Sequence, residues 1–324
     1  MRSKIWPPGL CLLMTICILM AGCGESSGGA DASLGESAKS SKTETAAQTK
    51  GSRDNTPVVL VPEASGEETE SNDISVIDSS NSSEGYVMVQ YTGDNSKVKL
   101  QICGPDGITY TYDLKTDDFE AFPLSAGSGT YSITVYENIS DDQYSTCLAT
   151  DIDADITNEF GPYLYPNKYC YFTADSAAVA KGSELAESAD TDLDVVSNVY
   201  NYVIDNIKYD YELAENLGSG YIPSPDDTLA SGKGICLDFA SLMVCMLRSQ
   251  NIPCQLEVGY AGEAYHAWIS VYTEDTGWIN GMIEFKGDEW ELMDPTFAAT
   301  SNGNDEELKK FIGDGSNYVV KYIY

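Results

Sequence analysis

The sequence has little histidine and little positive charge. A single histidine occurs in 324 residues, which argues against a zinc site made of clustered His and Cys ligands, and we predict no metal and no cofactor. Only 18 Lys and Arg residues stand against 51 Asp and Glu. This acidic balance repels phosphates, so nucleic acid is not an expected partner.

The chain also lacks a long hydrophobic run near its start. The apolar run at residues 10–20 is too short to cross a bilayer as a helix, and basic residues precede it. The following Ala21-Gly22-Cys23 resembles the lipobox of bacterial lipoproteins, with Met20 where Leu is usual. The resemblance implies a signal peptide over residues 1–22 and lipidation of Cys23. It places the protein on the extracytoplasmic face of a bacterial membrane, held through its lipid anchor only. A plain secretory signal is the alternative.

Residues 24–84 lack aromatic side chains and are rich in Ser, Gly, Thr, Ala and Glu. Such a composition buries too little apolar surface to fold, so we predict a disordered tether over residues 23–84. One apolar run, residues 58–61, interrupts it. This run is either a strand or a docking segment.

Residues 85–172 alternate between apolar and polar side chains, as in Val98, Leu100 and Ile102. Several short runs of this kind separated by turns predict an all-β sandwich. The pattern weakly resembles the immunoglobulin-like modules of bacterial surface proteins. A spacer or a binding module is the expected role.

From residue 173 to 324 the pattern becomes mixed. Apolar residues recur at helical spacing from Leu193 to Ile207, with Thr191 as the expected N-cap. A second helix is expected over residues 235–249, directly after Gly232 and Gly234. It places Cys236 in its first turn, where the helix dipole and free N–H groups favour a thiolate.

The only histidine, His266, lies on a predicted strand at residues 264–272, and an earlier strand is expected at residues 255–260. Asp294 follows a further predicted strand at residues 290–293. A carboxylate at the end of a neighbouring strand can orient an imidazole, which then serves as the base for a cysteine nucleophile.

Four segments carry a specific resemblance to the transglutaminase-like superfamily: "GKGICLDFASLMVCMLRSQNIPCQLEVGY", "YHAWISVY", "GW" and "WELMDPTF". The resemblance covers residues 191–297 and implies a papain-like core. It implies Cys236 as nucleophile, His266 as base and Asp294 as orienting acid, with Trp268 as the aromatic residue beside the histidine. The expected fold class is α+β, with an immunoglobulin-like sandwich followed by this domain, whose cysteine-bearing helix packs on an antiparallel sheet.

We therefore expect cysteine-dependent acyl transfer on a protein or peptide substrate, as a peptidase, deamidase or transamidase. Tyr221 is a candidate cleft residue and second oxyanion donor, and Asp226 and Asp227 are expected to cap the short helix before Gly232. The alternative is a catalytically silent surface module that binds a cell-wall or host ligand. The pairing of the remaining cysteines stays open.

Overall fold

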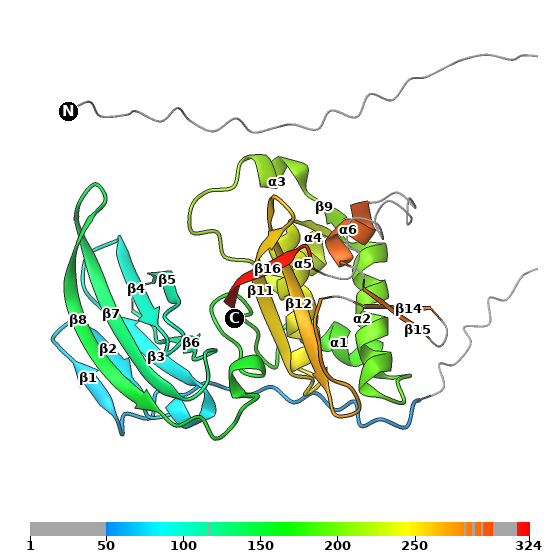
Figure 1. Cartoon of the computed structure of the whole chain (residues 1–324), viewed down its shortest axis with the longest axis horizontal. Coiled ribbons are helices and arrows are strands. Elements are labelled where there is room, and N and C mark those ends of the chain that lie inside the picture. The colour runs from blue at the N-terminus through cyan, green and yellow to red at the C-terminus, as the bar shows by residue number, and fades with distance from the viewer. Residues whose placement is uncertain (1–49, 116, 282, 287–288, 293, 301–315) are drawn as a thin grey trace, which may run out of the picture. The chain divides into compact units, whose positions relative to one another are not determined.

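The computed structural model describes residues 50–115, 117–281, 283–286, 289–292, 294–300 and 316–324 (Figure 1). The predicted signal peptide and Cys23 lie outside these residues and stay predictions. None of the helices in the described ranges is long and apolar enough to cross a membrane.

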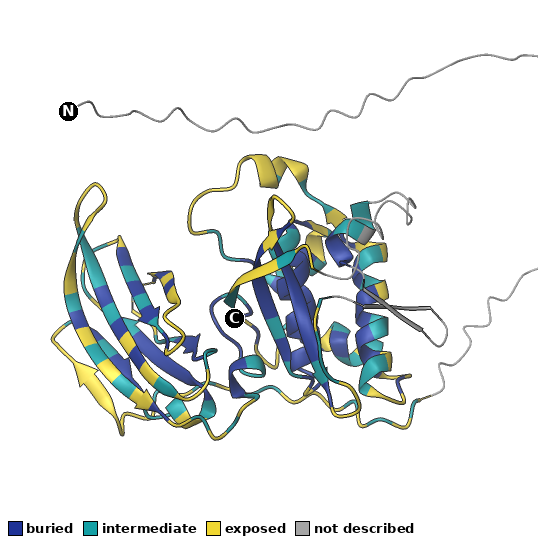
Figure 2. Cartoon of the chain, in the orientation of Figure 1, coloured by how far each residue is buried: buried dark blue, intermediate teal, exposed yellow. Residues whose placement is uncertain are grey.

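The first half of the described chain is built from eight strands in two four-stranded antiparallel sheets. The strand orders are β1-β2-β3-β6 and β5-β4-β7-β8. The strands are β1 (Thr69–Ser71), β2 (Ser75–Asp78), β3 (Tyr86–Tyr91), β4 (Val98–Cys103), β5 (Thr109–Leu114), β6 (Glu120–Pro123), β7 (Gly129–Ser140) and β8 (Gln143–Ala154). A short 3-10 turn spans Ser82–Glu84. Burial alternates along β4 and β5, as the period of two predicts (Figure 2).

The predicted tether is too long at its C-terminal end. β1 and β2 lie inside it, and β2 pairs with β3, with Ile77 opposite Val89. Ile77 is fully buried in the core, and the nearby Ile74 packs against the same core. Composition averaged over the segment therefore hid a short strand whose few apolar side chains reach the core, because backbone pairing with β3 supplies its other contacts. The immunoglobulin-like character of the sandwich stays a prediction.

Residues 50–62, which we call the N-terminal segment, dock on the second half of the chain. The Val58 N–H donates to the carbonyl of Ser249 at 2.8 Å, and Val58 forms an isolated parallel bridge with Gln250. Arg53 pairs with Asp192 at 2.6 Å and donates to the Gln250 carbonyl. Of the two possibilities for the apolar run at residues 58–61, docking is the one observed.

The second half combines a four-stranded antiparallel sheet, ordered β13-β12-β11-β16, with helices that surround α5. The helices are α1 (Ala177–Ala186), α2 (Asp192–Asn206), α3 (Tyr211–Glu215), α4 (Pro225–Ser231), α5 (Cys236–Arg248) and α6 (Pro295–Thr300). The strands are β9 (Lys208–Tyr209), β10 (Lys233–Gly234), β11 (Cys254–Ala261), β12 (Ala264–Thr273), β13 (Gly277–Ile279), β14 (Ile283–Lys286), β15 (Glu289–Leu292) and β16 (Tyr318–Ile323). A 3-10 turn, Gly161–Tyr163, lies between the two halves in sequence.

Helix α5 is the centre of this half. It packs against β11 and β12 on one side and against α1, α2 and α4 on others. Every residue from Asp238 to Arg248 is buried. A helix enclosed on all sides is held rigidly, so its first residue, Cys236, has a fixed position. The predicted N-cap of α2 is confirmed, since Thr191 and Asp194 form a capping box.

Arg248 ends α5 and is only 1% exposed. Its guanidinium donates to backbone carbonyls alone: to Tyr165 at 2.7 Å, to Cys254 at 2.7 and 3.0 Å, and to Tyr324 at 2.8 Å. Three chain segments therefore meet on one buried cation. The two halves also share a hydrogen bond from the Ser125 hydroxyl to the Ile323 carbonyl at 2.8 Å.

Candidate active site

The position of Cys236 depends on two glycines with different roles. Gly232 ends α4 in the left-handed conformation, with φ of 65°. Gly234 leaves room for the side chain of Asp238, because a Cβ on Gly234 would lie 2.6 Å from the Asp238 Cβ. Asp238 uses that room to accept a hydrogen bond from the Ile235 N–H at 2.8 Å. The first turn of α5 is thus ordered around Cys236, its first residue.

Tyr221 supports the same turn. Its hydroxyl donates to the other carboxylate oxygen of Asp238 at 2.8 Å, and burial raises the pKa of both groups. Since Tyr221 gives its one proton to Asp238, it orders the helix start and is not placed as an oxyanion donor. The expected cap of α4 also changes: Ser224 is the N-cap, and Asp226 accepts instead from the Ala178 N–H at 2.9 Å.

His266 and Asp294 meet as the sequence predicts. Nε2 of His266 lies 2.6 Å from Oδ2 of Asp294, and the two side chains are 5% and 3% exposed. Cys236 lies close enough to the imidazole to contribute to the raised pKa of His266. Helix, strand and the start of α6 therefore bring the three predicted residues together.

The electrostatics of the pair favour the imidazolium. Burial alone lowers the pKa of His266, but the carboxylate of Asp294 and the neighbouring Cys236 outweigh it and raise that pKa to about 10. A protonated imidazole beside a cysteine is the partner that a thiolate requires.

Asp294 is itself held in place by four contacts. Its Oδ1 accepts from the N–H groups of Thr296 and Phe297, at 3.0 and 3.2 Å, in the first turn of α6. Its Oδ2 accepts from the Tyr318 hydroxyl at 3.3 Å as well as facing His266. One carboxylate thus caps a helix and orients the histidine, which explains an Asp-Pro pair at this point of the chain.

Aromatic rings enclose the imidazole. The Phe297 ring lies 4.8 Å from the His266 ring, between centroids, and Trp268 lies 6.1 Å away in a near-parallel arrangement. Trp268 is buried and lies opposite Glu257 across β11 and β12. The two rings cover the imidazole, which is only 5% exposed.

Two tyrosines, Tyr209 and Tyr265, lie near the thiol. Tyr209 pairs across β9 and β10 with Gly234, two residues before Cys236. Burial, and then the nearby Cys236, raise the pKa of Tyr209 to about 12. Burial also raises the pKa of Tyr265, followed by smaller effects of Tyr322, Tyr260 and Cys236. Tyr265 was not predicted, although it directly precedes the predicted base in the sequence.

All six cysteines after residue 100 are free thiols. Cys170, Cys245 and Cys254 are buried, and burial raises their pKa values. Cys103 and Cys147 are partly exposed, like Cys236, but lie on β4 and β8 of the sandwich. Of the six thiols, Cys236 is therefore set apart by its partner and not by its exposure.

Comparison with known proteins bears on this constellation. Residues 180–281 match the transglutaminase-like superfamily. The matched part of the transglutaminase-like domain includes Cys236 and His266 and ends before Asp294. Within that domain the order of helix, cysteine, strand and histidine is the one that the resemblance implied.

Individual relatives are similar to part of this chain. UPF0252 protein MJ1282 of Methanocaldococcus jannaschii is 31% identical over 96 residues, which are 26% of this chain and 27% of that protein. Kyphoscoliosis peptidase of Homo sapiens is 28% identical over 130 residues, covering 35% of this chain and 20% of that protein. The chain thus spans about a quarter or less of these relatives' lengths. The periplasmic domain of TgpA from Pseudomonas aeruginosa aligns over 78% of this chain and 81% of its own, with 14% identity and a TM-score of 0.33.

Proposed function

We propose that this protein catalyses cysteine-dependent acyl transfer on peptide or glutamine-type amides, with Cys236 as nucleophile, His266 as acid–base and Asp294 as orienting group. The observation that carries the proposal is the buried 2.6 Å contact between His266 and Asp294, with Cys236 near enough to the same imidazole to help raise its pKa. The match to the transglutaminase-like superfamily supports it.

The first half of the reaction forms a thioester. The sulfur of Cys236 attacks the amide carbonyl carbon, and the oxyanion accepts from N–H groups at the start of α5, ahead of the Asp238 N–H, which already donates to the Ile235 carbonyl at 2.9 Å. The C–N bond breaks as the His266 imidazolium gives its proton to the departing amine. Asp294 stabilises the imidazolium before this transfer and keeps the ring in one orientation afterwards.

The second half returns the enzyme. Neutral His266 takes a proton from water or from a primary amine, which attacks the thioester carbonyl. The C–S bond breaks and Cys236 leaves as thiolate beside the renewed imidazolium. Water gives hydrolysis or deamidation, and a lysine amine gives a cross-link.

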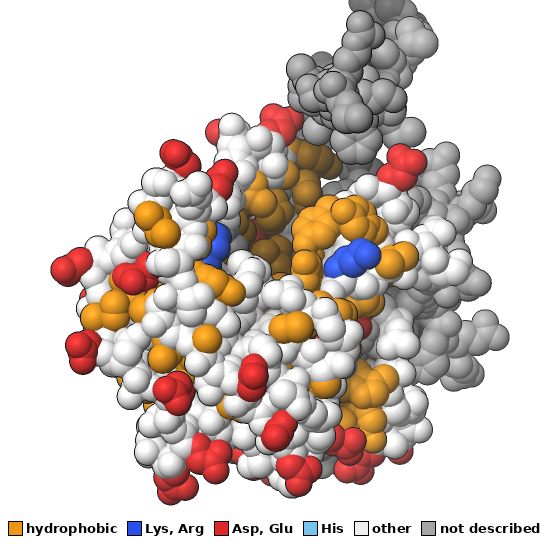
Figure 3. All heavy atoms as spheres, turned by 60° about the vertical axis from the view of Figure 1, so that its left-hand side comes forward, with side chains coloured by type: hydrophobic (Ala, Val, Ile, Leu, Met, Phe, Trp, Pro, Cys, Tyr) orange, Lys and Arg blue, Asp and Glu red, His pale blue; other side chains and the backbone are white. Residues whose placement is uncertain are grey.

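We further propose that the reaction takes place on the extracytoplasmic face of a bacterial membrane, with Cys23 carrying the lipid. The support is the sequence around the predicted cleavage site and the strongly acidic surface, part of which is visible in Figure 3 as scattered carboxylates. Metabolic labelling with an alkyne fatty acid tests the anchor: Cys23→Ser removes the label, whereas Cys103→Ser retains it.

The catalytic proposal is tested by comparing thiols within one protein. Iodoacetamide labelling at neutral pH, followed by peptide mass spectrometry, gives the alkylation rate of Cys236 relative to Cys103 and Cys147, which share its partial exposure. We expect Cys236 to react at least about tenfold faster. Turnover is then followed on casein, both as release of peptides and as incorporation of a fluorescent amine.

Cys236→Ser is expected to abolish both activities, and Cys103→Ser to leave them unchanged. Equal alkylation of the three thiols, together with activity that survives Cys236→Ser, contradicts the proposal and favours the silent binding module. The ratio of peptide release to amine incorporation separates hydrolysis from cross-linking.

A further inference from the structure

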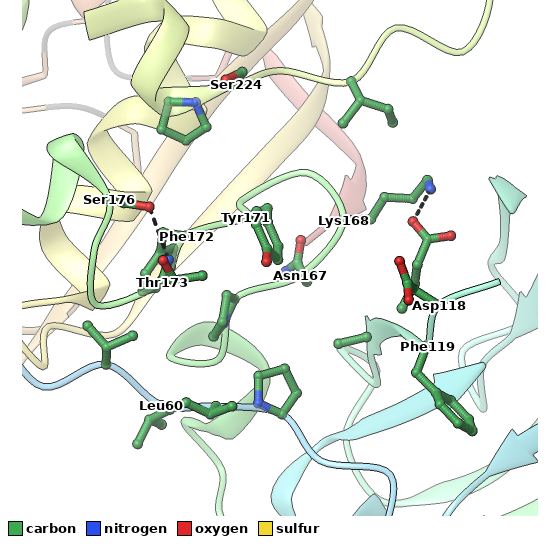
Figure 4. Close-up of a pocket in the computed structure, with 18 of the residues that line it drawn as sticks. Leu60, Asp118, Phe119, Asn167, Lys168, Tyr171, Phe172, Thr173, Ser176 and Ser224 are labelled. Carbon is green, nitrogen blue, oxygen red and sulfur yellow. Dashed lines mark hydrogen bonds and ion pairs between the residues drawn. The ribbon is translucent and has the colours of Figure 1, made fainter. Parts of the chain in front are cut away.

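A cavity of about 840 Å³ lies outside the Cys236 site, between the sandwich and the transglutaminase-like domain. Four segments line it: residues 59–62 of the N-terminal segment, residues 118–121 at β6, residues 166–176, and residues 222–226 before and at the start of α4. Figure 4 shows these segments around the cavity. The mechanism described above uses none of them.

The walls are largely apolar and irregular. Val59, Val61, Phe172, Ile222 and Pro223 are among the lining residues. Tyr171 also borders the cavity and is 65% exposed, an unusual position for a large ring without a partner across it. Such a surface takes apolar side chains.

One polar group in the cavity has no partner. Asn167 is 4% exposed; its Oδ1 accepts from the Tyr169 N–H at 3.0 Å, but its Nδ2 makes no hydrogen bond in the described part of the chain. Figure 4 shows Asn167 between Tyr171 and Lys168. A buried N–H donor without an acceptor is costly, and an incoming carbonyl oxygen would satisfy it.

Two charged residues of the lining, Lys168 and Glu120, are already paired. Lys168 and Glu120 form an ion pair at 2.5 Å, and the second oxygen of Glu120 accepts from the Lys115 N–H at 2.8 Å. The group that the cavity lacks is therefore an uncharged acceptor. A peptide carbonyl has this chemistry, and β6 is an edge strand of its sheet, the kind of element beside which extended peptides bind.

We infer that this cavity is a second peptide-binding site, which holds an extended apolar segment of a protein substrate through a backbone carbonyl on Asn167 Nδ2. The loop at residues 222–226 connects it to Tyr221, which bonds Asp238 next to Cys236. A long polypeptide can thus occupy both places. The inference rests on the proposed function in one respect: the bound segment is taken to belong to the enzyme's protein substrate.

Binding is measured without turnover, on the full chain carrying Cys236→Ser. The probe is a fluorescein-labelled, C-terminally amidated Ala-Val-Leu-Val-Pro peptide, titrated by fluorescence anisotropy. Asn167→Asp keeps the acceptor for Tyr169 but exchanges the free donor for a carboxylate oxygen, which repels a carbonyl, so we expect affinity to fall about tenfold or more. Asn201→Asp, the same change on the exposed side of α2, is the matched control and leaves affinity unchanged.

Tyr171→Ala gives an independent measure, because an exposed ring can be removed without disturbing the core; we expect at least a threefold loss of affinity. A version of the peptide with p-benzoylphenylalanine in place of leucine should cross-link within residues 166–176 or 222–226. Three results would each overturn the inference. The first is no binding up to millimolar peptide, and the second is equal affinities of Asn167→Asp and Asn201→Asp with no effect of Tyr171→Ala. The third is cross-linking confined to residues 260–268. If the peptide binds but the wild-type protein does not turn over casein, the proposed function alone is refuted.

Discussion

Asp294→Asn isolates the electrostatic part of the proposed site. The substitution keeps the size of the side chain and an oxygen that can cap α6, but removes the negative charge beside His266. In the wild type the pKa of His266 stands at about 10 against an ordinary value of 6.5. At about 1.4 kcal/mol per pH unit, this difference corresponds to roughly 5 kcal/mol in favour of the imidazolium, as an upper limit.

Without the carboxylate, burial is the largest influence left, and it lowers the pKa of His266. We therefore expect the pKa to fall by at least about two units, so that the imidazole loses its proton near neutral pH. Turnover should fall about 10²- to 10⁴-fold, the range for removing the orienting carboxylate of a catalytic histidine.

The assay benefits from the composition of the chain. Because His266 is the only histidine, one imidazole resonance in a pH titration by NMR reports the site directly. Asp151→Asn, which removes an exposed carboxylate on β8 bonded to Ser132, is the control and should leave that resonance unchanged. A pKa that stays above 9 in Asp294→Asn would refute the electrostatic reasoning.

Three further predictions concern stability. Folding raises the pKa of His266, so protonation of this histidine stabilises the folded state. This stabilisation is complete below about pH 6.5 and is lost as the pH rises towards 10. The free energy of unfolding, measured in urea, should therefore fall across this pH range by up to a few kcal/mol, and less steeply in His266→Gln. Arg248→Met leaves buried carbonyls without donors, and we expect a loss of about 3 kcal/mol or more in urea unfolding; a loss below about 1 kcal/mol would show that water replaces the guanidinium. Gly234→Ala brings a Cβ within 2.6 Å of Asp238 and should cost about 1–3 kcal/mol and slow Cys236 alkylation, whereas Gly218→Ala, with nothing within 4 Å, should do neither.

The sequence predicted those parts of the site that sit on regular elements. The predicted helix at residues 235–249 corresponds to α5, and the predicted strands at residues 255–260 and 264–272 correspond to β11 and β12. A period of 3.6 or of two, sustained over a whole element, is governed by local geometry, so it survives in the sequence. Once these elements were predicted, the positions of Cys236 at the start of a helix and of His266 on a strand followed.

The supporting contacts could not be predicted, because they join residues far apart in the chain. Tyr221 reaches Asp238, and Tyr318 reaches Asp294, through tertiary packing that leaves no local pattern. Arg248 was a similar case: a charged residue at a helix end suggests solvent, and only the fold shows it buried among carbonyls. For residues 50–62 the sequence offered docking only as one of two possibilities at residues 58–61, because the contacts of Arg53 with Asp192 and Gln250 are tertiary.

That docking has a mechanical consequence. The N-terminal segment contacts Asp192, Ser249 and Gln250 of the transglutaminase-like domain before the chain enters β1 of the sandwich. A pull applied at residue 50 therefore loads the ends of α2 and α5 first, and the sandwich bears force only after these contacts break. Cys236 is the first residue of α5, and the contacts that bear the force lie at the other end of the same helix. Tension along the chain would therefore be transmitted to Cys236 through the enclosed helix α5.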